Sequence, residues 1–554
     1  MITRLQLIIV AIFEVDISNS CRGSIKNYLA KKKHTLALNA VSSSGKVTKF
    51  FKDNTLSSEN VLIAAKEGTF AYQTINHMQS FRSLDCTSKL IATLFEPKCT
   101  LGRTQSEVIV KNVFAKEAQS RLNNALQKNN YFSVMVDSSN HREIKVVPLL
   151  VRYIDSDKGI QIPIVSKYIG LSADNTNTNF GGPNRQGKNN LFKKLTHSCS
   201  TSIVGVGCVV HILNNCIQNS TDVLPFDIEV IVVKIYKYFY IYTVRVSTLK
   251  TFCDSVEVEY KKMLSFSKTR FLSLMPAVER ILQMFEPLKV YFESTECPTI
   301  LKEFFENPVG EVWFWFIHNN SLLFHQAILK IEGDKISATE ASLDKVKASL
   351  SKLQSLNPNE DVYDQFSLKA EKFYSSCINY LNKWSTNMNN IKLFSWICLH
   401  DLVTWNQITT SCETFKNSLG TNLNEDQLFD EIGHLKLYLT KEKLTDWNKN
   451  NISTEDRWLE FFRFMKGKLV PVPNLEKLCE FVLCLPGTSA PIERLFSHIN
   501  KYWTSEKSQL EISSLKSIMQ VYTNFDESCH KMFNMLKMDQ KILKEIHGSQ
   551  KYLK

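Results

Sequence analysis

The sequence contains no CxxC pair and no apolar run long enough to cross a membrane. Its 14 cysteines are scattered without the paired spacing of a zinc ribbon or a small disulfide-rich domain. In a chain of 554 residues they are typical of reduced thiols in an intracellular protein. Because a membrane-spanning helix needs about 20 apolar residues in succession, we expect no membrane partner.

One shorter apolar run, LQLIIVAIF at residues 5–13, lies near the start of the chain. It resembles the core of a weak signal peptide, but the basic segment before it is poor and no clean small-x-small cleavage site follows. We therefore interpret the run as a buried strand or as the product of an incorrect start codon.

The composition is that of a globular protein with an excess of positive charge. Hydrophobic residues make up 44% and charged residues 22%, which excludes a disordered chain, and the length predicts three or four structural units. The net charge of +12 favours an anionic partner such as nucleic acid. Half of the excess lies in residues 1–53, with nine Lys/Arg against three Asp/Glu. A solvated basic tail explains this bias as well as DNA binding does.

Helical periodicity dominates most of the chain. Helices are predicted over residues 24–40 and within 55–128, where Ser57 and Thr104 are candidate N-caps. The pattern is helical again from about Asp227 to about Lys468. This stretch includes the apolar series Val278, Ile281, Leu282, Phe285 and Leu288.

Two prolines, Pro471 and Pro473, mark a boundary after the helical stretch. Beyond them, Thr488 or Ser489 is positioned to cap a helix that has Pro491 in its first turn, where a missing N–H costs nothing. A second helix is predicted over residues 508–522.

Four β-strands are predicted between residues 131 and 174. The first ends at Asp137, and the second, residues 144–153, contains Pro148, which weakens an unbroken ladder. The third covers residues 159–165, and the fourth ends at Asp174. Strand ends can converge at one edge of a sheet, where carboxylates bind the pair of Mg²⁺ ions used in phosphodiester cleavage. Asp137 and Asp174 fit that role, although strand-end aspartates more often serve turns and caps.

Five blocks of the sequence resemble, in order, those of transposases of the hAT (hobo, Activator, Tam) superfamily. The resemblance covers about residues 130–540. The blocks are FSVMVDSSN (132–140), SADNTNTNFGG (172–182), GVGCVVHILNN (205–215), KTRFLSL (268–274) and LPGTSAPIERLFS (485–497).

The resemblance implies an α/β RNase H-like core with a mixed sheet, interrupted by a long all-α insertion, in a chain that is mostly α overall. We expect a basic N-terminal segment, an N-terminal helical region, the first part of the core, the insertion, and the last part of the core with a dimerisation region. These parts correspond to residues 1–54, 55–128, 129–265, 266–470 and 471–545.

The resemblance also implies a catalytic, metal-binding triad of Asp137, Asp174 and Glu493, which would hold Mg²⁺ or Mn²⁺. The residue pattern agrees for Glu493, because Ile492 and Phe496 are placed to anchor the first turns of its helix. A favourable charge at a helix N-terminus is the simpler reading of that glutamate.

Further residues are candidates for contacts with nucleic acid. Arg270 and Lys188 are candidate phosphate ligands, as are Lys193 and Lys194, although a solvated face explains each of them equally well. Phe271 stands where the family has tryptophan and can stack on a base.

Cys208 and His211 have the spacing of half a zinc site, but no matching second half lies nearby, and we expect no zinc. We expect His211 to support DNA or the catalytic acids instead. The segment GGPNRQG (181–187) lacks the ending of a nucleotide-binding P-loop, which excludes that function.

Two departures from the family predict a loss of activity. The segment SIKNYLAKKKH resembles the tail of a BED-type zinc finger, but only His34 of the expected ligands is in place, with Tyr28 at a histidine position and Cys21 unpaired. In the RNase H-like order, residues 159–173 would have to supply a strand, a crossover helix and a second strand, and they are too few.

We therefore expect a nuclear, transposon-derived protein that binds DNA and is catalytically impaired. We expect it to form homodimers or higher homo-oligomers through residues 475–544. The alternative is an active Mg²⁺-dependent transposase that cuts and joins transposon ends. A third hypothesis, an all-helical interaction scaffold, leaves the ordered acidic blocks unexplained.

Overall fold

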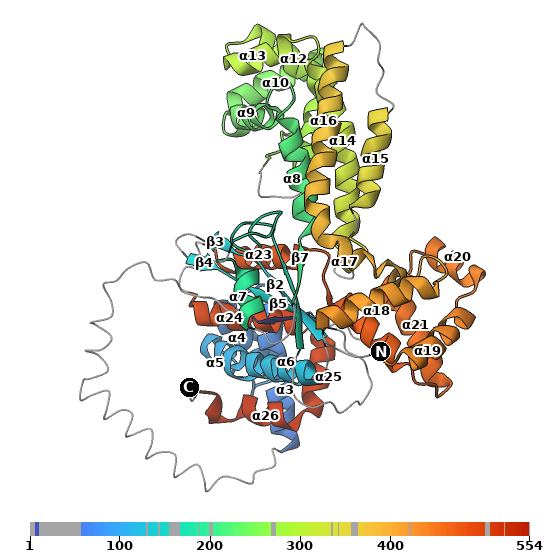
Figure 1. The fold of residues 1–554 in the computed structure, drawn as a ribbon. Helices are drawn as coiled ribbons and strands as arrows, with labels where there is room; N and C mark the ends of the chain where they lie inside the picture. The colour runs from blue at the N-terminus through green and yellow to red at the C-terminus, as the bar shows by residue number, and fades with distance from the viewer. Residues whose placement is uncertain are drawn as a thin grey trace.

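The computed structural model describes most of the chain, and all statements below concern this part. The described residues are 6–9, 57–128, 131–141, 144–153, 167–187, 189–198, 203–266, 273–333, 336–341, 343–355, 364–419, 423–504, 510–525 and 527–552. They are mostly helical with a small mixed sheet, as predicted for the fold class (Figure 1). Within these ranges no helix has both the length and the apolar character needed to cross a membrane.

The sheet has the strand order β1-β5-β2-β6-β7. Strand β2 (Tyr131–Val136) pairs in parallel with β6 (Lys167–Ala173), which pairs in parallel with β7 (Val204–Gly207). On the other side of β2, β5 (Leu149–Tyr153) is antiparallel. A hairpin of β3 (Ser139–His141) and β4 (Ile144–Val146) lies apart from this sheet. The predicted strand over residues 144–153 is thus interrupted at Pro148, in line with the missing N–H donor of proline.

The crossover helix expected before β6 falls outside the described residues, as does the predicted strand over residues 159–165, and both stay predictions. Among the described strands, Tyr153 at the end of β5 lies opposite Phe132, and Lys167 at the start of β6 lies opposite Tyr131. Because β5 is antiparallel to β2 and β6 is parallel to it, both ends flank the start of β2.

The sheet edge beside β5 is formed by β1 (Gln6–Ile9), from the apolar N-terminal run. Its pairing with β5 is antiparallel, so β1 is parallel to β2. The interpretation of this run as a strand is confirmed. The other N-terminal predictions, the helix over residues 24–40 and the zinc-finger remnant with Cys21, Tyr28 and His34, fall outside the described residues.

Helices from both ends of the sequence share one hydrophobic core. Tyr72 and Phe525, 453 residues apart, are joined by a hydrogen bond of 2.6 Å from the tyrosine hydroxyl to the backbone carbonyl. The N-terminal elements are α3 (Ser58–Asn76), η2 (Phe81–Ser83), α4 (Leu84–Leu94), α5 (Arg103–Ile109), the π-helical turn η3 (Val110–Phe114) and α6 (Ala115–Lys128). Their C-terminal partners are α23 (Ala490–Tyr502), α24 (Ile512–Asn524), α25 (Cys529–Met538), α26 (Gln540–His547) and η7 (Ser549–Tyr552).

The predicted N-caps had different outcomes. Ser57 caps α3, because its side chain accepts a hydrogen bond of 3.2 Å from the Asn60 N–H. Thr104 is not a cap. Helix α5 begins one residue earlier, at Arg103, with the extended Gly102 as its N-cap residue.

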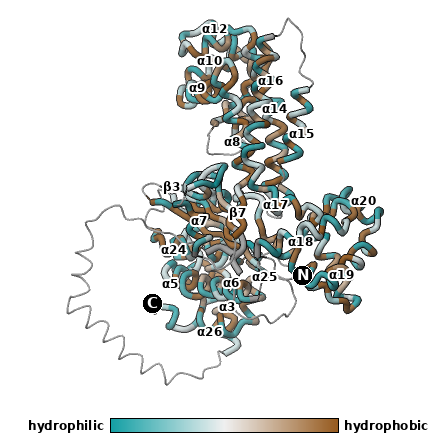
Figure 2. Tube along the Cα trace, viewed as in Figure 1, coloured by the Kyte–Doolittle hydropathy of each residue, from teal (hydrophilic) through white to brown (hydrophobic). Residues whose placement is uncertain are grey.

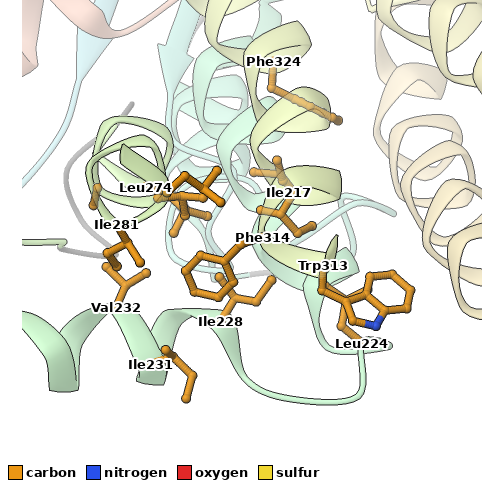
Figure 3. Packing of buried hydrophobic residues seen from close by; sticks show 14 of the residues in the cluster. Ile217, Leu224, Ile228, Ile231, Val232, Leu274, Ile281, Trp313, Phe314 and Phe324 are labelled. Atoms are coloured by element: carbon orange, nitrogen blue, oxygen red, sulfur yellow. The ribbon is translucent and has the colours of Figure 1, made fainter. Parts of the chain in front are cut away.

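The helical stretch after β7 divides into two parts (Figure 1). The first part has its own core, in which Ile217, Ile228 and Phe314 from three helices lie together (Figure 3). It comprises α8 (Val209–Thr221), α9 (Ile228–Tyr240), α10 (Thr243–Ser255), α11 (Leu274–Gln283), α12 (Phe285–Ser294), α13 (Thr299–Glu306), α14 (Gly310–Ile331), α15 (Asp344–Ser355) and α16 (Asp364–Ser385). The apolar series 278–288 is buried as predicted, but Met284 separates it into α11 and α12.

The second part packs around Trp458 and Phe415 and reaches the sheet through Tyr131. Hydrophobic residues alternate with hydrophilic ones along its helices, as in the rest of the chain (Figure 2). Its elements are η5 (Thr386–Met388), α17 (Asn389–Lys392), η6 (Ser395–Cys398), α18 (Trp405–Leu419), α19 (Glu425–Tyr438), α20 (Lys441–Lys449), α21 (Thr454–Gly467) and α22 (Pro473–Cys484).

A buried carboxylate fixes the start of α22. Glu431 of α19 is 2% exposed, and it accepts hydrogen bonds from the backbone N–H groups of Asn474 and Leu475 at 3.2 and 2.7 Å. It also accepts a bond of 2.8 Å from the Asn474 side-chain amide. A negative charge is favourable at this end of a helix, where N–H groups lack partners within the helix.

We expect Glu431→Ala to destabilise the protein by about 3 kcal/mol, because it leaves these buried donors without an acceptor. Glu431→Gln keeps one acceptor oxygen and should cost less. Urea unfolding measures both effects, with Glu371→Ala on the exposed face of α16 as the control, expected to change stability by less than about 0.5 kcal/mol. An alanine variant as stable as this control would contradict the assigned role.

Candidate metal centre

Three parallel strand ends are aligned at one edge of the sheet. Val136 lies opposite Ala173, and Ala173 lies opposite Gly207. The residues that follow, Asp137, Asp174 and Cys208, therefore come to the same edge. The two strands that are followed by aspartate are side by side and parallel, so their ends converge at one edge of the sheet as predicted.

The start of helix α8 brings a histidine to this edge. The Cys208 N–H donates to the Ala173 carbonyl at 2.9 Å, which continues the β6–β7 pairing by one residue. Helix α8 begins at the next residue, Val209, so His211 lies in its first turn.

The turn before α23 lies against the start of α8 and brings Glu493 to the same place. The Val209 N–H donates to the Gly487 carbonyl at 3.4 Å, and the Ser489 N–H donates to the Cys208 Sγ at 3.3 Å. The predicted helix start is confirmed at Ala490, whose N–H donates to the Thr488 hydroxyl at 3.0 Å.

A segment of the insertion holds the other side of this turn. The Ala338 N–H donates to the Leu485 carbonyl at 2.9 Å, and Ser337 forms a bridge with Pro486. A Cβ atom on Gly487 would lie 2.5 Å from the Ala341 Cβ and 2.7 Å from the Ser337 carbonyl oxygen. Position 487 therefore requires glycine, which accounts for part of the LPGTSAPIERLFS block.

Asp137, His211 and Glu493 form the candidate metal centre. Each offers one ligand atom, and these atoms lie within 4.8 Å of one another. The Nε2 atom of His211 is 3.9 Å from the Oε1 atom of Glu493. Asp137 is 8% exposed and also accepts a bond of 2.7 Å from the Ser138 N–H.

The pKa values of Asp137 and Glu493 are both raised, because two negative charges close together and out of water repel each other. Burial and the neighbouring Asp137 raise the pKa of Glu493 to about 8. Burial likewise raises the pKa of Asp137, although hydrogen bonds from Glu493 and Ser138 act in the other direction. The pair therefore retains a proton near neutral pH, as expected for carboxylates in contact.

His211 and Cys208 favour an imidazolium–thiolate pair. Burial by itself would lower the pKa of His211, but Cys208, Asp137 and Glu493 raise it to about 9. Burial by itself would raise the pKa of Cys208, but His211 and Ser489 lower it to about 6. In the absence of a metal ion, the His211 imidazolium thus places a positive charge between the Cys208 thiolate and the two carboxyl groups.

Asp174 lies at the same edge but outside this three-residue cluster. Its Oδ1 atom accepts hydrogen bonds from the Thr176 hydroxyl, at 2.9 Å, and from the Asn179 side-chain amide. Its charge still raises the pKa of Asp137, so the two side chains are within electrostatic range. The carboxylate is therefore near the centre but is bound by its own loop.

The loop after β6 explains the two glycines of the GVGC segment. Asn175 donates to the Cys208 carbonyl at 3.1 Å, and a Cβ atom on Gly207 would lie 1.9 Å from the Asn175 Oδ1 atom. Arg185 lies over the rings of Phe180 and Phe192 and donates to the Gly205 carbonyl at 2.7 Å. Sequence reasoning missed Asn175 and Arg185, for which the spaced glycines were the available signal.

Of the other residues predicted to contact nucleic acid, some lie outside the described residues and some lie on a helix near the candidate metal centre. Lys188, Arg270 and Phe271 lie outside the described residues. Lys193 and Lys194 lie on α7 (Leu191–Ser198), which follows the loop, and Lys194 is exposed. His211 lies beside Asp137 and Glu493 in the candidate metal centre, and its expected support of DNA or of the catalytic acids stays a prediction.

The pKa of Glu493 predicts a pH dependence of stability without metal. Because this pKa is raised from 4.5 to about 8, the stability that Glu493 contributes is fully present below pH 4.5 and is lost as the pH rises through 8. Glu493→Gln does not titrate, so in EDTA its Tm minus that of the wild type should become more positive between pH 5 and pH 8. Glu303→Gln, exposed on α13, should show a constant difference. A constant difference for Glu493→Gln would contradict the shifted pKa.

Comparisons with known proteins do not assign this site. No protein-family model matches the sequence, and no curated protein matches it. A function for this site therefore has to be inferred from its geometry and from the resemblance of the quoted blocks.

Proposed function

We propose that this protein is a metal-dependent phosphodiester-cleaving protein of the hAT transposase type, with DNA as its substrate. The observation that carries this proposal is the convergence of Asp137, Glu493 and His211 within 4.8 Å at the end of parallel strands. Asp137 and Glu493 come from blocks separated by the whole helical insertion. A shared site is the expected result if both blocks serve one reaction.

The sheet supports an RNase H-like identity for the core. Its central strand β2 has one antiparallel and one parallel neighbour, and the first acidic residue follows that strand directly. The helices between β7 and α23 separate the two acidic blocks, and the insertion that the resemblance implies, residues 266–470, lies within this stretch.

The donor set fits a divalent metal ion. Carboxylate oxygens are ligands that Mg²⁺ and Mn²⁺ prefer, and Asp137 and Glu493 would hold the ion. Bound there, the ion would supply charge stabilisation for the attacking and leaving oxygens of a phosphodiester. The chain itself buries Asp137, covers Glu493 in part and keeps a proton on this pair of carboxyl groups while no ion is bound.

One observation favours a second candidate function, a DNA-binding homodimer without catalysis. The third acid of the expected triad, Asp174, accepts hydrogen bonds from Thr176 and Asn179 rather than completing the cluster. The net charge of +12 suits DNA in both cases. Dimerisation through the C-terminal region and a nuclear location rest on the resemblance alone. In that region, Leu515 and Ile518 are buried in the chain's own core and are not available to a second copy.

Nicking of supercoiled plasmid DNA in Mg²⁺ or Mn²⁺ separates these candidates. For a nuclease, we expect Asp137→Asn and Glu493→Gln each to reduce the rate by about 100-fold or more, because each removes a metal ligand. Glu303→Gln is the control. Nicking that survives both site substitutions would contradict the proposal, and a wild-type protein that binds but never nicks DNA would favour the second candidate.

DNA binding itself is tested by the salt dependence of the affinity for random duplex DNA. Release of counterions should weaken binding by about 10³-fold or more between 50 and 200 mM salt if several phosphates are contacted. Asp137→Asn should bind as wild type or slightly tighter, because it removes a negative charge. An affinity that does not change with salt would count against both candidates.

A further inference from the structure

The third side chain of the candidate metal centre is an imidazole rather than a carboxylate. His211 Nε2 lies 3.9 Å from Glu493 Oε1, and the ligand atoms of His211, Asp137 and Glu493 lie within 4.8 Å of one another. Asp174, the expected third acid, is bound to Thr176 and Asn179. Imidazole is a common ligand of first-row transition metals, whereas Mg²⁺ favours oxygen ligands and water.

Cys208 supports the histidine from the other side. Cys208 is the N-cap residue of α8 and His211 follows three residues later in the first turn, so the two side chains are neighbours. The thiol is itself fully buried and held by the Ser489 N–H at 3.3 Å and by the Thr488 hydroxyl at 3.6 Å. Histidines that bind metals commonly have such a second partner, which fixes the orientation of the ring.

We propose that His211 is a ligand of the ion held by Asp137 and Glu493, that Cys208 positions its ring, and that the site prefers Mn²⁺, or another first-row divalent ion, over Mg²⁺. This inference rests on the proposed function only in assuming that a metal ion binds at this edge of the sheet. Metal binding is measurable without DNA, so it can fail or succeed independently of cleavage.

The first experiment uses the full chain and calorimetric titration with Mn²⁺ and Mg²⁺. His211→Gln should weaken Mn²⁺ binding by about tenfold or more and leave Mg²⁺ binding within a few fold. The Mn²⁺/Mg²⁺ affinity ratio therefore falls. His434→Gln, an exposed histidine of α19, is the matched control and should retain the wild-type ratio. An unchanged ratio in His211→Gln would overturn the proposal.

The second experiment detects an imidazole ligand directly in the wild-type protein, and the variants then identify which histidine supplies it. Pulsed EPR of Mn²⁺ bound to the wild-type chain should show hyperfine coupling to an imidazole nitrogen, which is retained in His434→Gln and lost in His211→Gln. Wild-type protein that binds Mn²⁺ without this coupling overturns the inference, even if Mg²⁺-dependent nicking succeeds. Coupling without any nicking supports the inference and counts against the nuclease.

The role of Cys208 is tested by two substitutions of similar size. Cys208→Ser keeps a hydrogen-bonding atom next to the imidazole and should retain the nitrogen coupling and most of the Mn²⁺ affinity. Cys208→Val removes that atom and should weaken Mn²⁺ binding by roughly 10- to 100-fold. Equal Mn²⁺ affinities and spectra for the two variants would overturn the positioning role.

Discussion

The candidate site depends on the contact between the start of α8 and the turn before α23. Hydrogen bonds join these segments from Val209 N–H to Gly487, from Ser489 N–H to the Cys208 sulfur, and between Cys208 and the Thr488 hydroxyl. They fix the turn beside the ends of β2 and β6, and the packing of Ile492 and Met135 in one core holds the helix that carries Glu493. Gly487 is essential to this contact, since any side chain there would meet Ser337 and Ala341. The helical insertion thus also supports one wall of the turn that carries the glutamate.

The sequence predicted the parts of this site that depend on local pattern. Alternation of apolar and polar residues marked the strand that ends at Asp137, and a second predicted strand ended at Asp174, next to the last residue of β6 in the structure. Proline at position 491 and the apolar residues around Glu493 marked the helix start. The residue roles implied by the family resemblance, by contrast, were not derivable from periodicity.

The parts that were missed depend on contacts between distant segments or on competition between hydrogen bonds. Cys208 and His211 look like half of a zinc site in the sequence, and only the fold brings His211 to the carboxylates. Asp174 has polar neighbours two and five residues later that bind its carboxylate, which is the turn role that strand-end aspartates more often have. The antiparallel course of β5 depends on its pairing with β2 and cannot be read from its own residues.

The shared core of the N- and C-terminal helices has a consequence for how the protein is made in the cell. During translation, α3 leaves the ribosome more than 400 residues before α25, which packs against it. Until then the apolar face that includes Tyr72 and Ala65 has only part of its native cover, from α5. We expect chaperones to bind this face while the rest of the chain is made. Premature stop codons near the 3′ end of the message would yield a product that is recognised as unfolded, despite an intact insertion.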